Sequence, residues 1–166
     1  MRFDDAARAA LVLKYAQGPS RLREAWASVP EDARQWRPGP GQWSAHEIVV
    51  HCGDSETNAA QRIRYLLAEK ETTIVGYDQD AWAREFDYHA HPVELALQAV
   101  DAVRANTAAM LRHLPPAAWS RAGRHSERGP YSAEDWLAIY ADHVHNHASQ
   151  IERNLAAWRA RSPVVS

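Results

Sequence analysis

The sequence has little cysteine and little lysine, and it lacks any long hydrophobic run. Its single cysteine, Cys52, excludes a disulfide framework and a multi-cysteine zinc finger within one chain, which fits a reducing cytoplasm. No stretch approaches the ~20 apolar residues that a membrane span needs, and the acidic start at Asp4 and Asp5 does not fit a signal peptide. The formal net charge of −2 provides no basic field for nucleic acid. We therefore expect a cytoplasmic protein that binds neither a membrane nor a nucleic acid.

What is present is typical of one globular domain. The chain has 166 residues, of which 46% are hydrophobic and 24% are charged. This length lies in the usual range of ~100–200 residues for one domain and is sufficient for a hydrophobic core. Because no repeat or low-complexity tract divides the chain, we expect a single domain over residues 1–166.

Hydrophobic periodicity predicts four long helices and almost no strand. Apolar residues recur at helical spacing over about 3–27, 44–69, 92–114 and 132–160. Ser44-Ala-His-Glu47 is a capping box that begins the second helix, whereas Gly18-Pro19 should kink the first helix or restart it. The segments 71–90 and 119–130 lack a period and are predicted to be irregular connections. The pattern indicates an all-α fold, a four-helix bundle.

The strongest candidate site is His143-Val-His145-Asn-His147 in the last predicted helix. Residues four apart on a helix differ by only ~40° in direction and ~6 Å along the axis, so His143 and His147 could bind one metal ion. This pair borders the apolar stripe of the helix, whereas His145 lies ~200° away from His143 and should face outward. The alternative is that His143 and His147 are ordinary interior histidines that only make hydrogen bonds.

A third histidine near this pair would favour a metal site over ordinary interior histidines. His51 lies near the start of the second predicted helix and could meet His143 and His147 if the second and fourth helices face each other. Three neutral imidazoles suit zinc, nickel or another late divalent ion of the first row, and they leave coordination positions open for water or substrate. Spacing alone does not fix whether His51 reaches the pair, so three hydrogen-bonded core histidines stay an open alternative.

Other residues could assist such a site. Asp54 and Asp142 could accept hydrogen bonds from ligand imidazoles or be surface acids, and Glu56 and Arg62 could pair with each other or reach the rim of the site. Cys52 fits a small core residue better than a ligand. The loop before the last helix carries basic residues that could hold an anionic substrate or simply face solvent: Arg121, Arg124, His125 and Arg128.

Three segments resemble, in order and spacing, motifs of the DinB/YfiT-like superfamily. They are Gly41-Gln-Trp43-Ser44-Ala-His-Glu47-Ile-Val-Val-His51-Cys-Gly-Asp54-Ser55-Glu56, Gly76-Tyr77-Asp78-Gln-Asp80-Ala-Trp82, and Ala141-Asp-His143-Val-His-Asn-His147-Ala-Ser-Gln150-Ile151. The resemblance implies an up-down-down-up four-helix bundle, often dimeric, whose metal ligands are His51, His143 and His147. Many relatives have two adjacent histidines at the end of the last motif, where this chain has Asn146 in the first place. This departure leaves the ligand pair intact.

The resemblance to the YfiT branch implies a metal-dependent hydrolase that acts on a small molecule, and this is the leading hypothesis. An open three-histidine ion can also bind and activate a thiolate, so a low-molecular-weight-thiol S-transferase or a thiol-dependent isomerase is the first alternative. The second is a non-catalytic, metal-stabilised stress-response bundle, which would need a fourth protein ligand to close the metal site. The expected cofactor is one divalent ion, zinc or nickel, and the expected partners are a small-molecule substrate and a second copy of the chain. No catalytic acid or base is evident from the sequence.

Overall fold

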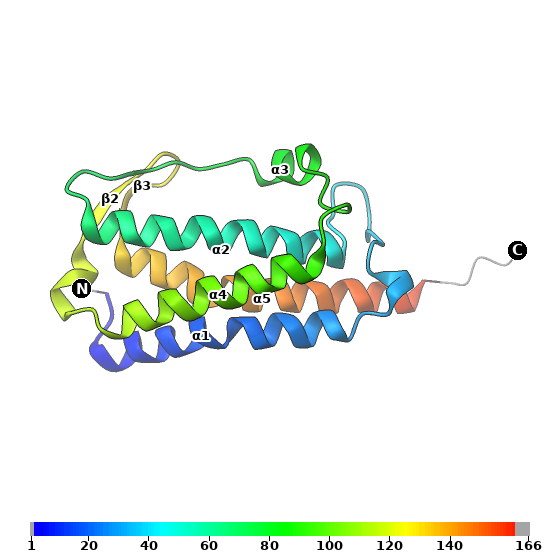
Figure 1. Ribbon diagram of the computed structural model, residues 1–166, viewed down its shortest axis with the longest axis horizontal. Coiled ribbons are helices and arrows are strands. Elements are labelled where there is room, and N and C mark those ends of the chain that lie inside the picture. The colour runs from blue at the N-terminus through cyan, green and yellow to red at the C-terminus, as the bar shows by residue number, and fades with distance from the viewer. Residues whose placement is uncertain (1, 162–166) are drawn as a thin grey trace, which may run out of the picture.

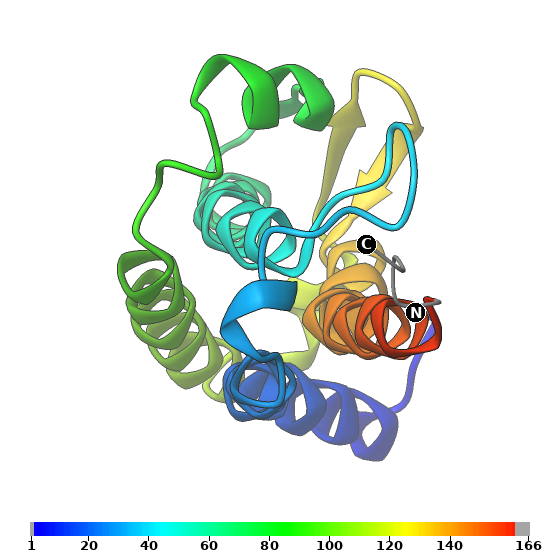
Figure 2. The same cartoon turned by 90° about the vertical axis from the view of Figure 1, so that its right-hand side faces the viewer.

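The computed structural model describes residues 2–161, and four long helices make up most of it (Figure 1). They are α1 (Asp5–Ala27), α2 (Ala45–Ala68), α4 (Val93–Arg112) and α5 (Ala133–Ala160). The main contacts join α1 with α5, α5 with α2, α2 with α4 and α4 with α1, so each helix occupies one corner of a bundle (Figure 2). The predicted all-α four-helix bundle is confirmed.

The helices run up, down, down and up. In Figure 1, α1 and α5 run from left to right, whereas α2 and α4 run from right to left. Neighbouring helices can run in the same direction only if the chain between them returns along the bundle. The segment 69–92 makes this return between α2 and α4, passing over α2 (Figure 1). It therefore adds a layer beside α2.

Short elements occupy the two segments that were predicted to be irregular. The first contains β1 (Thr73–Ile74) and α3 (Gln79–Glu85), and the second contains β2 (Ala122–His125) and the first half of β3 (Gly129–Ser132). The strands form one sheet in the order β1-β2-β3, in which β1 is parallel to β2 and β2 is antiparallel to β3. Such short strands carry too few alternating residues to give a period of two, so the prediction missed them. Two 3-10 turns, η1 (Glu31–Ala33) and η2 (Pro116–Ser120), complete the described chain.

Pro19 does not break α1, contrary to the prediction of a kink or a restart. The helix is continuous from Asp5 to Ala27 with Pro19 inside it. Proline lacks the N–H that would bond to the carbonyl four residues earlier, which is that of Tyr15. The Tyr15 carbonyl instead accepts a hydrogen bond of 2.6 Å from Nη1 of Arg104 on α4. A buried side chain from another helix thus replaces the missing backbone donor.

The neighbouring Gly18 makes room for the same arginine. A Cβ at position 18 would clash with Nη1 of Arg104, so no larger residue fits here without displacing the guanidinium. Gly18 therefore leaves space for the Arg104 guanidinium, and Pro19 leaves the Tyr15 carbonyl free to accept from it, so the two residues do not end the helix.

A polar layer divides the core of the bundle into two hydrophobic clusters. One cluster includes Leu22 and Ile48, the other includes Ile63 and Trp136, and all four are fully buried. The layer between them contains Arg104 and Glu56, which are also fully buried. The candidate site lies at the edge of this layer.

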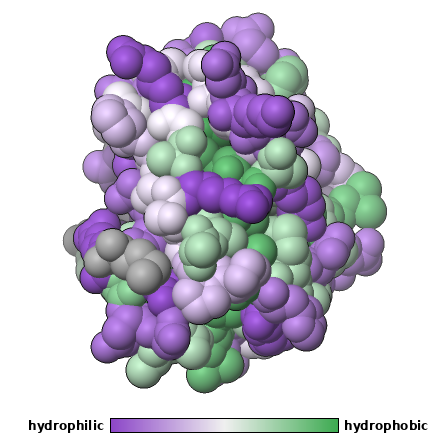
Figure 3. Space-filling view, turned by 90° about the vertical axis from the view of Figure 1, so that its left-hand side faces the viewer, coloured by the Kyte–Doolittle hydropathy of each residue, from purple (hydrophilic) through white to green (hydrophobic). Residues whose placement is uncertain are grey.

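The end of the bundle where α4 leads into η2 has an apolar strip on its surface (Figure 3). A groove of about 370 Å³ lies there between α1, α4 and η2, and its apolar lining includes Leu13, Leu111 and Trp119. Leu13 is 54% exposed. No helix within residues 2–161 is both long and apolar enough to cross a membrane.

Candidate metal centre

Two helices bring three histidines together. His51 extends from α2, and His143 and His147 extend from successive turns of α5. One ring nitrogen from each of the three lies within 4.8 Å of the others, and the ring centroids are 4.6 to 5.6 Å apart. The structure thus brings together the three residues that were predicted as ligands. His145 lies apart from them, where its Nε2 is 2.9 Å from the Lys14 carbonyl oxygen.

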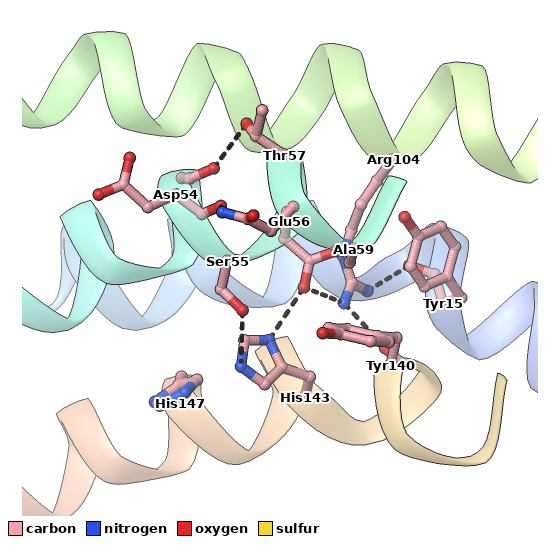
Figure 4. A network of polar contacts seen from close by, with 12 residues as sticks. Tyr15, Asp54, Ser55, Glu56, Thr57, Ala59, Arg104, Tyr140, His143 and His147 are labelled. Carbon is pink, nitrogen blue, oxygen red and sulfur yellow. Dashed lines mark hydrogen bonds and ion pairs between the residues drawn. The ribbon is translucent and has the colours of Figure 1, made fainter. Parts of the chain in front are cut away.

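Side-chain acceptors fix how the two histidines of α5 are oriented, and Figure 4 shows the acceptor of His143. Nδ1 of His143 lies 2.9 Å from Oε1 of Glu56. Nδ1 of His147 lies 2.9 Å from Oε1 of Gln150. A carboxylate and an amide oxygen only accept, so both Nδ1 atoms carry the proton. The lone pair of each neutral ring is then on Nε2. Orienting partners of this kind are typical of metal-binding histidines.

His51 is the most deeply buried of the three, with 1% of its surface exposed. Its ring packs against Trp43, and its buried Nδ1 has no hydrogen-bond partner among the described residues. Burial, and then the proximity of His147 and His143, lowers the pKa of His51 to about 2. Burial and the proximity of His143 lower the pKa of His147 to about 4. Both rings are therefore neutral at physiological pH, which is the form that binds metals.

These observations fit a divalent ion. The three imidazoles converge with ring nitrogens within 4.8 Å of one another, and the lone pairs of unprotonated rings bind a divalent cation. A buried ring nitrogen without a partner is costly, and a bound ion would remove that cost for the cluster.

Glu56 is held in its place by Arg104 (Figure 4). Nε and Nη2 of Arg104 donate to the two carboxylate oxygens at 2.9 and 2.8 Å, and both side chains are completely buried. Nη2 also donates to the Tyr140 carbonyl at 2.8 Å, and the guanidinium lies 4.1 Å from the centroid of the Tyr15 ring. Burial alone would raise the pKa of Glu56, but Arg104 and His143 together lower it below its ordinary value. The ionised Glu56 can then both pair with Arg104 and accept from His143.

A cavity of about 880 Å³ opens beside the histidines. His143 and His147 line it, together with residues of the loop before α2, of α2 and α5, and of the layer formed by β2, β3, α3 and the chain before α3. Ser55 and Trp43 belong to this lining, and the Ser55 hydroxyl lies 3.4 Å from Nε2 of His143. A small molecule in this cavity would therefore reach the histidine cluster.

Of the other residues that the sequence suggested for the site, some lie at the histidine cluster or its cavity and the rest make contacts elsewhere. Asp54 accepts a hydrogen bond from the Tyr88 hydroxyl and Asp142 pairs with Lys14, so neither orients a ligand imidazole. Cys52 is a buried core residue, and burial raises the pKa of its thiol. Glu56 pairs with Arg104, and Arg62 reaches the cavity.

Sequence reasoning did not assign Glu56, Gln150 and Arg104 to these roles. Gln150 follows His147 by three residues, and this helical spacing could have indicated the contact. Arg104 interrupts an apolar stripe of α4 that includes Leu97, Val100 and Leu111, and a charged residue on such a stripe signals a buried partner. No local pattern identifies Glu56 as that partner, because the pair joins two helices 48 residues apart in sequence.

Comparison with known protein families agrees with this geometry. A family model of the DinB superfamily matches residues 14–151, which include all three histidines. The chain belongs to the DinB superfamily. Among curated relatives, a protein of Oceanobacillus iheyensis, named as a presumed metal-dependent hydrolase, is 32% identical over 111 residues. That alignment spans 67% of this chain and 64% of the relative, just under two thirds of its length.

Solved structures of other proteins show the same fold. YfiT from Bacillus subtilis, described as a probable metal-dependent hydrolase with an unusual four-helix bundle topology, superposes with a TM-score of 0.88 and 21% identity, covering 95% of this chain and 90% of YfiT. A mycothiol-dependent maleylpyruvate isomerase superposes with a TM-score of 0.69 and 12% identity, covering 87% of this chain and 60% of the isomerase. The first likeness confirms the up-down-down-up bundle of this DinB-superfamily protein.

Proposed function

We propose that this DinB-superfamily protein is a metal-dependent hydrolase that acts on a small molecule in the 880 Å³ cavity, with one divalent ion held by His51, His143 and His147. The observation that carries the proposal is the convergence of three imidazoles beside an open cavity. The names given to its relatives agree with it.

The donor set favours an open site over a closed structural one. Within residues 2–161, the group of His, Cys, Asp and Glu side chains that could hold the ion consists of these three histidines alone. Three protein ligands leave room for water and substrate, whereas a structural zinc usually has four. This argues against the non-catalytic, metal-stabilised bundle. Zinc and nickel both suit three imidazoles.

Each part of the chain has a distinct task in this proposal. A divalent ion would supply Lewis acidity, which polarises an ester, amide or related group and makes water more acidic. Glu56 and Gln150 keep the protons of His143 and His147 on Nδ1, and Trp43 packs against His51 on the cavity side. Ser55, close to His143, can orient a substrate or a water by hydrogen bonding.

The test is a screen of ester, amide and related small-molecule hydrolyses with protein purified without a histidine tag. We expect activity in the metal-loaded protein, its loss after chelation, and its recovery after zinc or nickel is restored. His147→Ala should be inactive, whereas the matched variant His145→Ala should keep most activity. Equal activity in the chelated and loaded proteins would contradict the proposal.

A thiol-dependent transferase or isomerase is the second candidate. The structural likeness to a mycothiol-dependent isomerase favours it, as does a cavity near the upper end of the volumes usual for ligand pockets. Metal-dependent consumption of a low-molecular-weight thiol in the presence of an electrophile, without hydrolysis of any substrate, would favour this candidate over the first.

We also propose that the protein is a cytoplasmic homodimer. The exposed apolar groove between α1, α4 and η2 supports the dimer, as does the resemblance to a family that is often dimeric. Light scattering at micromolar concentration should give twice the mass of the chain, and a monomer mass would contradict this part.

A further inference from the structure

Basic side chains line the cavity beside the histidines. Arg62 comes from α2, His125 and Arg128 come from β2 and the turn that follows it, and Arg153 comes from α5. The acidic residues of the lining are Asp80 and Glu127. The cavity therefore has more cationic than anionic groups.

The arginines of this lining differ from Arg8, Arg23 and Arg104 in their partners. Arg8, Arg23 and Arg104 each form an ion pair with a carboxylate. In the described part of the chain, Arg62, Arg128 and Arg153 form none. Their charge is not neutralised by the protein.

Neutral groups hold Arg62 in a defined position. Nη1 donates to the Tyr140 hydroxyl at 3.1 Å, Nη2 donates to the Val75 carbonyl at 2.6 Å, and the guanidinium lies 5.6 Å from the centroid of the Tyr77 ring. Since a guanidinium has five N–H groups and these contacts use two, donors are left for a ligand. Arg62 is thus positioned but not neutralised, which suits binding of an anion.

His125 adds a neutral donor beside the arginines. It is 6% exposed, and its Nδ1 accepts from the Glu127 backbone N–H at 3.2 Å, so the neutral ring carries its proton on Nε2. Burial, and then the charges of Arg62 and Arg128, lower its pKa. His125 and the two arginines line the same cavity.

Tyr140 connects this region to the metal centre. Its hydroxyl accepts from Arg62, and its ring centroid is 5.5 Å from that of His143. Arg62 also lies two turns beyond Ser55 on α2, a rise of about 10 Å. One small molecule could therefore touch the histidine cluster with one end and Arg62 with the other.

We propose that Arg62, Arg128 and His125 form a subsite that binds a carboxylate of the substrate while its reactive group lies at the histidine cluster. This inference rests on the proposed function, because it assigns the substrate class of the same cavity. Two of the four basic residues of the loop before α5 are excluded from the subsite. Arg121 donates to the Leu67 carbonyl, and Arg124 lies outside the cavity lining.

The test compares two thiol probes of equal length, ω-mercaptohexanoate and ω-mercaptohexanol, on the cobalt-loaded protein. A thiolate that binds the metal gives a charge-transfer absorption band, and the two probes differ only in their carboxylate and alcohol ends. We expect the carboxylate probe to bind at least about tenfold more tightly, because a charge-assisted contact contributes that much. The preference should decrease with added salt.

Variants assign the preference to the subsite. Arg62→Gln and Arg128→Gln should each reduce the preference several-fold and leave the affinity for the alcohol unchanged, whereas the control Arg124→Gln from the same hairpin should change neither. Equal affinity for the two probes in the wild-type protein, or an unchanged preference in the Arg62→Gln/Arg128→Gln double variant, would overturn the inference.

The metal site and the subsite can fail separately. Loss of the absorption band with both probes would contradict the open metal site of the proposed function. Calorimetric titration of the metal-free protein with adipate would then decide the subsite: binding that the double variant abolishes supports it, and no binding overturns it.

Discussion

At the residue scale, the histidine cluster depends on side chains that never touch the cavity. Arg104 supplies the hydrogen-bond donor that Pro19 lacks and pairs with Glu56. Glu56 in turn accepts a hydrogen bond from His143. This series of contacts crosses the bundle from α1 to α5. A buried ion pair of this kind is weak support for stability as such, but it leaves an uncompensated charge if one partner is removed.

Gly18→Ala should therefore disturb both the fold and the site. The new Cβ would clash with Arg104, and overpacking of this kind costs about 1–3 kcal/mol of unfolding free energy. Urea unfolding measures this loss. Gly39→Ala is the matched control, because the nearest atoms to a Cβ there lie at an ordinary distance of 3.5 Å. Equal stability of the Gly18→Ala and wild-type proteins would show that Arg104 does not need the space.

Gln150→Ala separates metal binding from folding. Gln150 lines the cavity and accepts from His147, so its loss should lower metal affinity about 10–100-fold and leave the unfolding free energy nearly unchanged. Competition with a chromophoric chelator measures the affinity. Gln98→Ala, on the exposed face of α4, is the control and should keep wild-type affinity. An unchanged metal affinity in Gln150→Ala would show that Gln150 is not needed to orient His147 for metal binding.

At the element scale, the start of α2 positions His51. Ser44 and Glu47 form the capping box, and Glu47 also pairs with Arg37 and lies 3.4 Å from His89. Burial opposes ionisation of Glu47, but the hydrogen bonds from Arg37 and from the Ser44 backbone outweigh it, so its pKa is below the ordinary 4.5. The buried carboxylate thus stabilises the fold only while it is ionised.

The sign of the resulting pH dependence follows from this lowered pKa. The stabilisation by Glu47 is fully present above pH 4.5 and is lost as the pH falls through the lower folded-state value. Glu47→Gln should therefore be less stable than wild type by about 1–3 kcal/mol at neutral pH, and the difference should shrink in acid. Urea unfolding between neutral pH and pH ~3 measures it, with the exposed Glu69→Gln as control. A difference that is constant with pH would contradict this account of the cap.

At the scale of the whole molecule, contacts between residues far apart in the chain could not be predicted from local sequence patterns. Periodicity predicted the four helices, and the spacing of His143 and His147 predicted their common direction, because both signals are local. The meeting of His51 with that pair and the up-down-down-up order came from family resemblance, since no local pattern encodes them. The three-stranded sheet was missed because strands of two to four residues are too short to show an alternating pattern. The Arg104–Glu56 pair was missed because an arginine on an apolar stripe does not reveal which residue on another helix it pairs with.

Metal content of the tag-free protein is the most direct test of the central claim, that His51, His143 and His147 jointly bind one divalent ion. Elemental analysis after dialysis against trace zinc or nickel should give one ion per chain in the wild-type protein and in His145→Ala. It should give less than a tenth of that in His51→Ala, His143→Ala and His147→Ala, each checked to be folded by circular dichroism. Full metal content in a folded His51→Ala protein, or equal loss from His145→Ala and His147→Ala, would contradict the account.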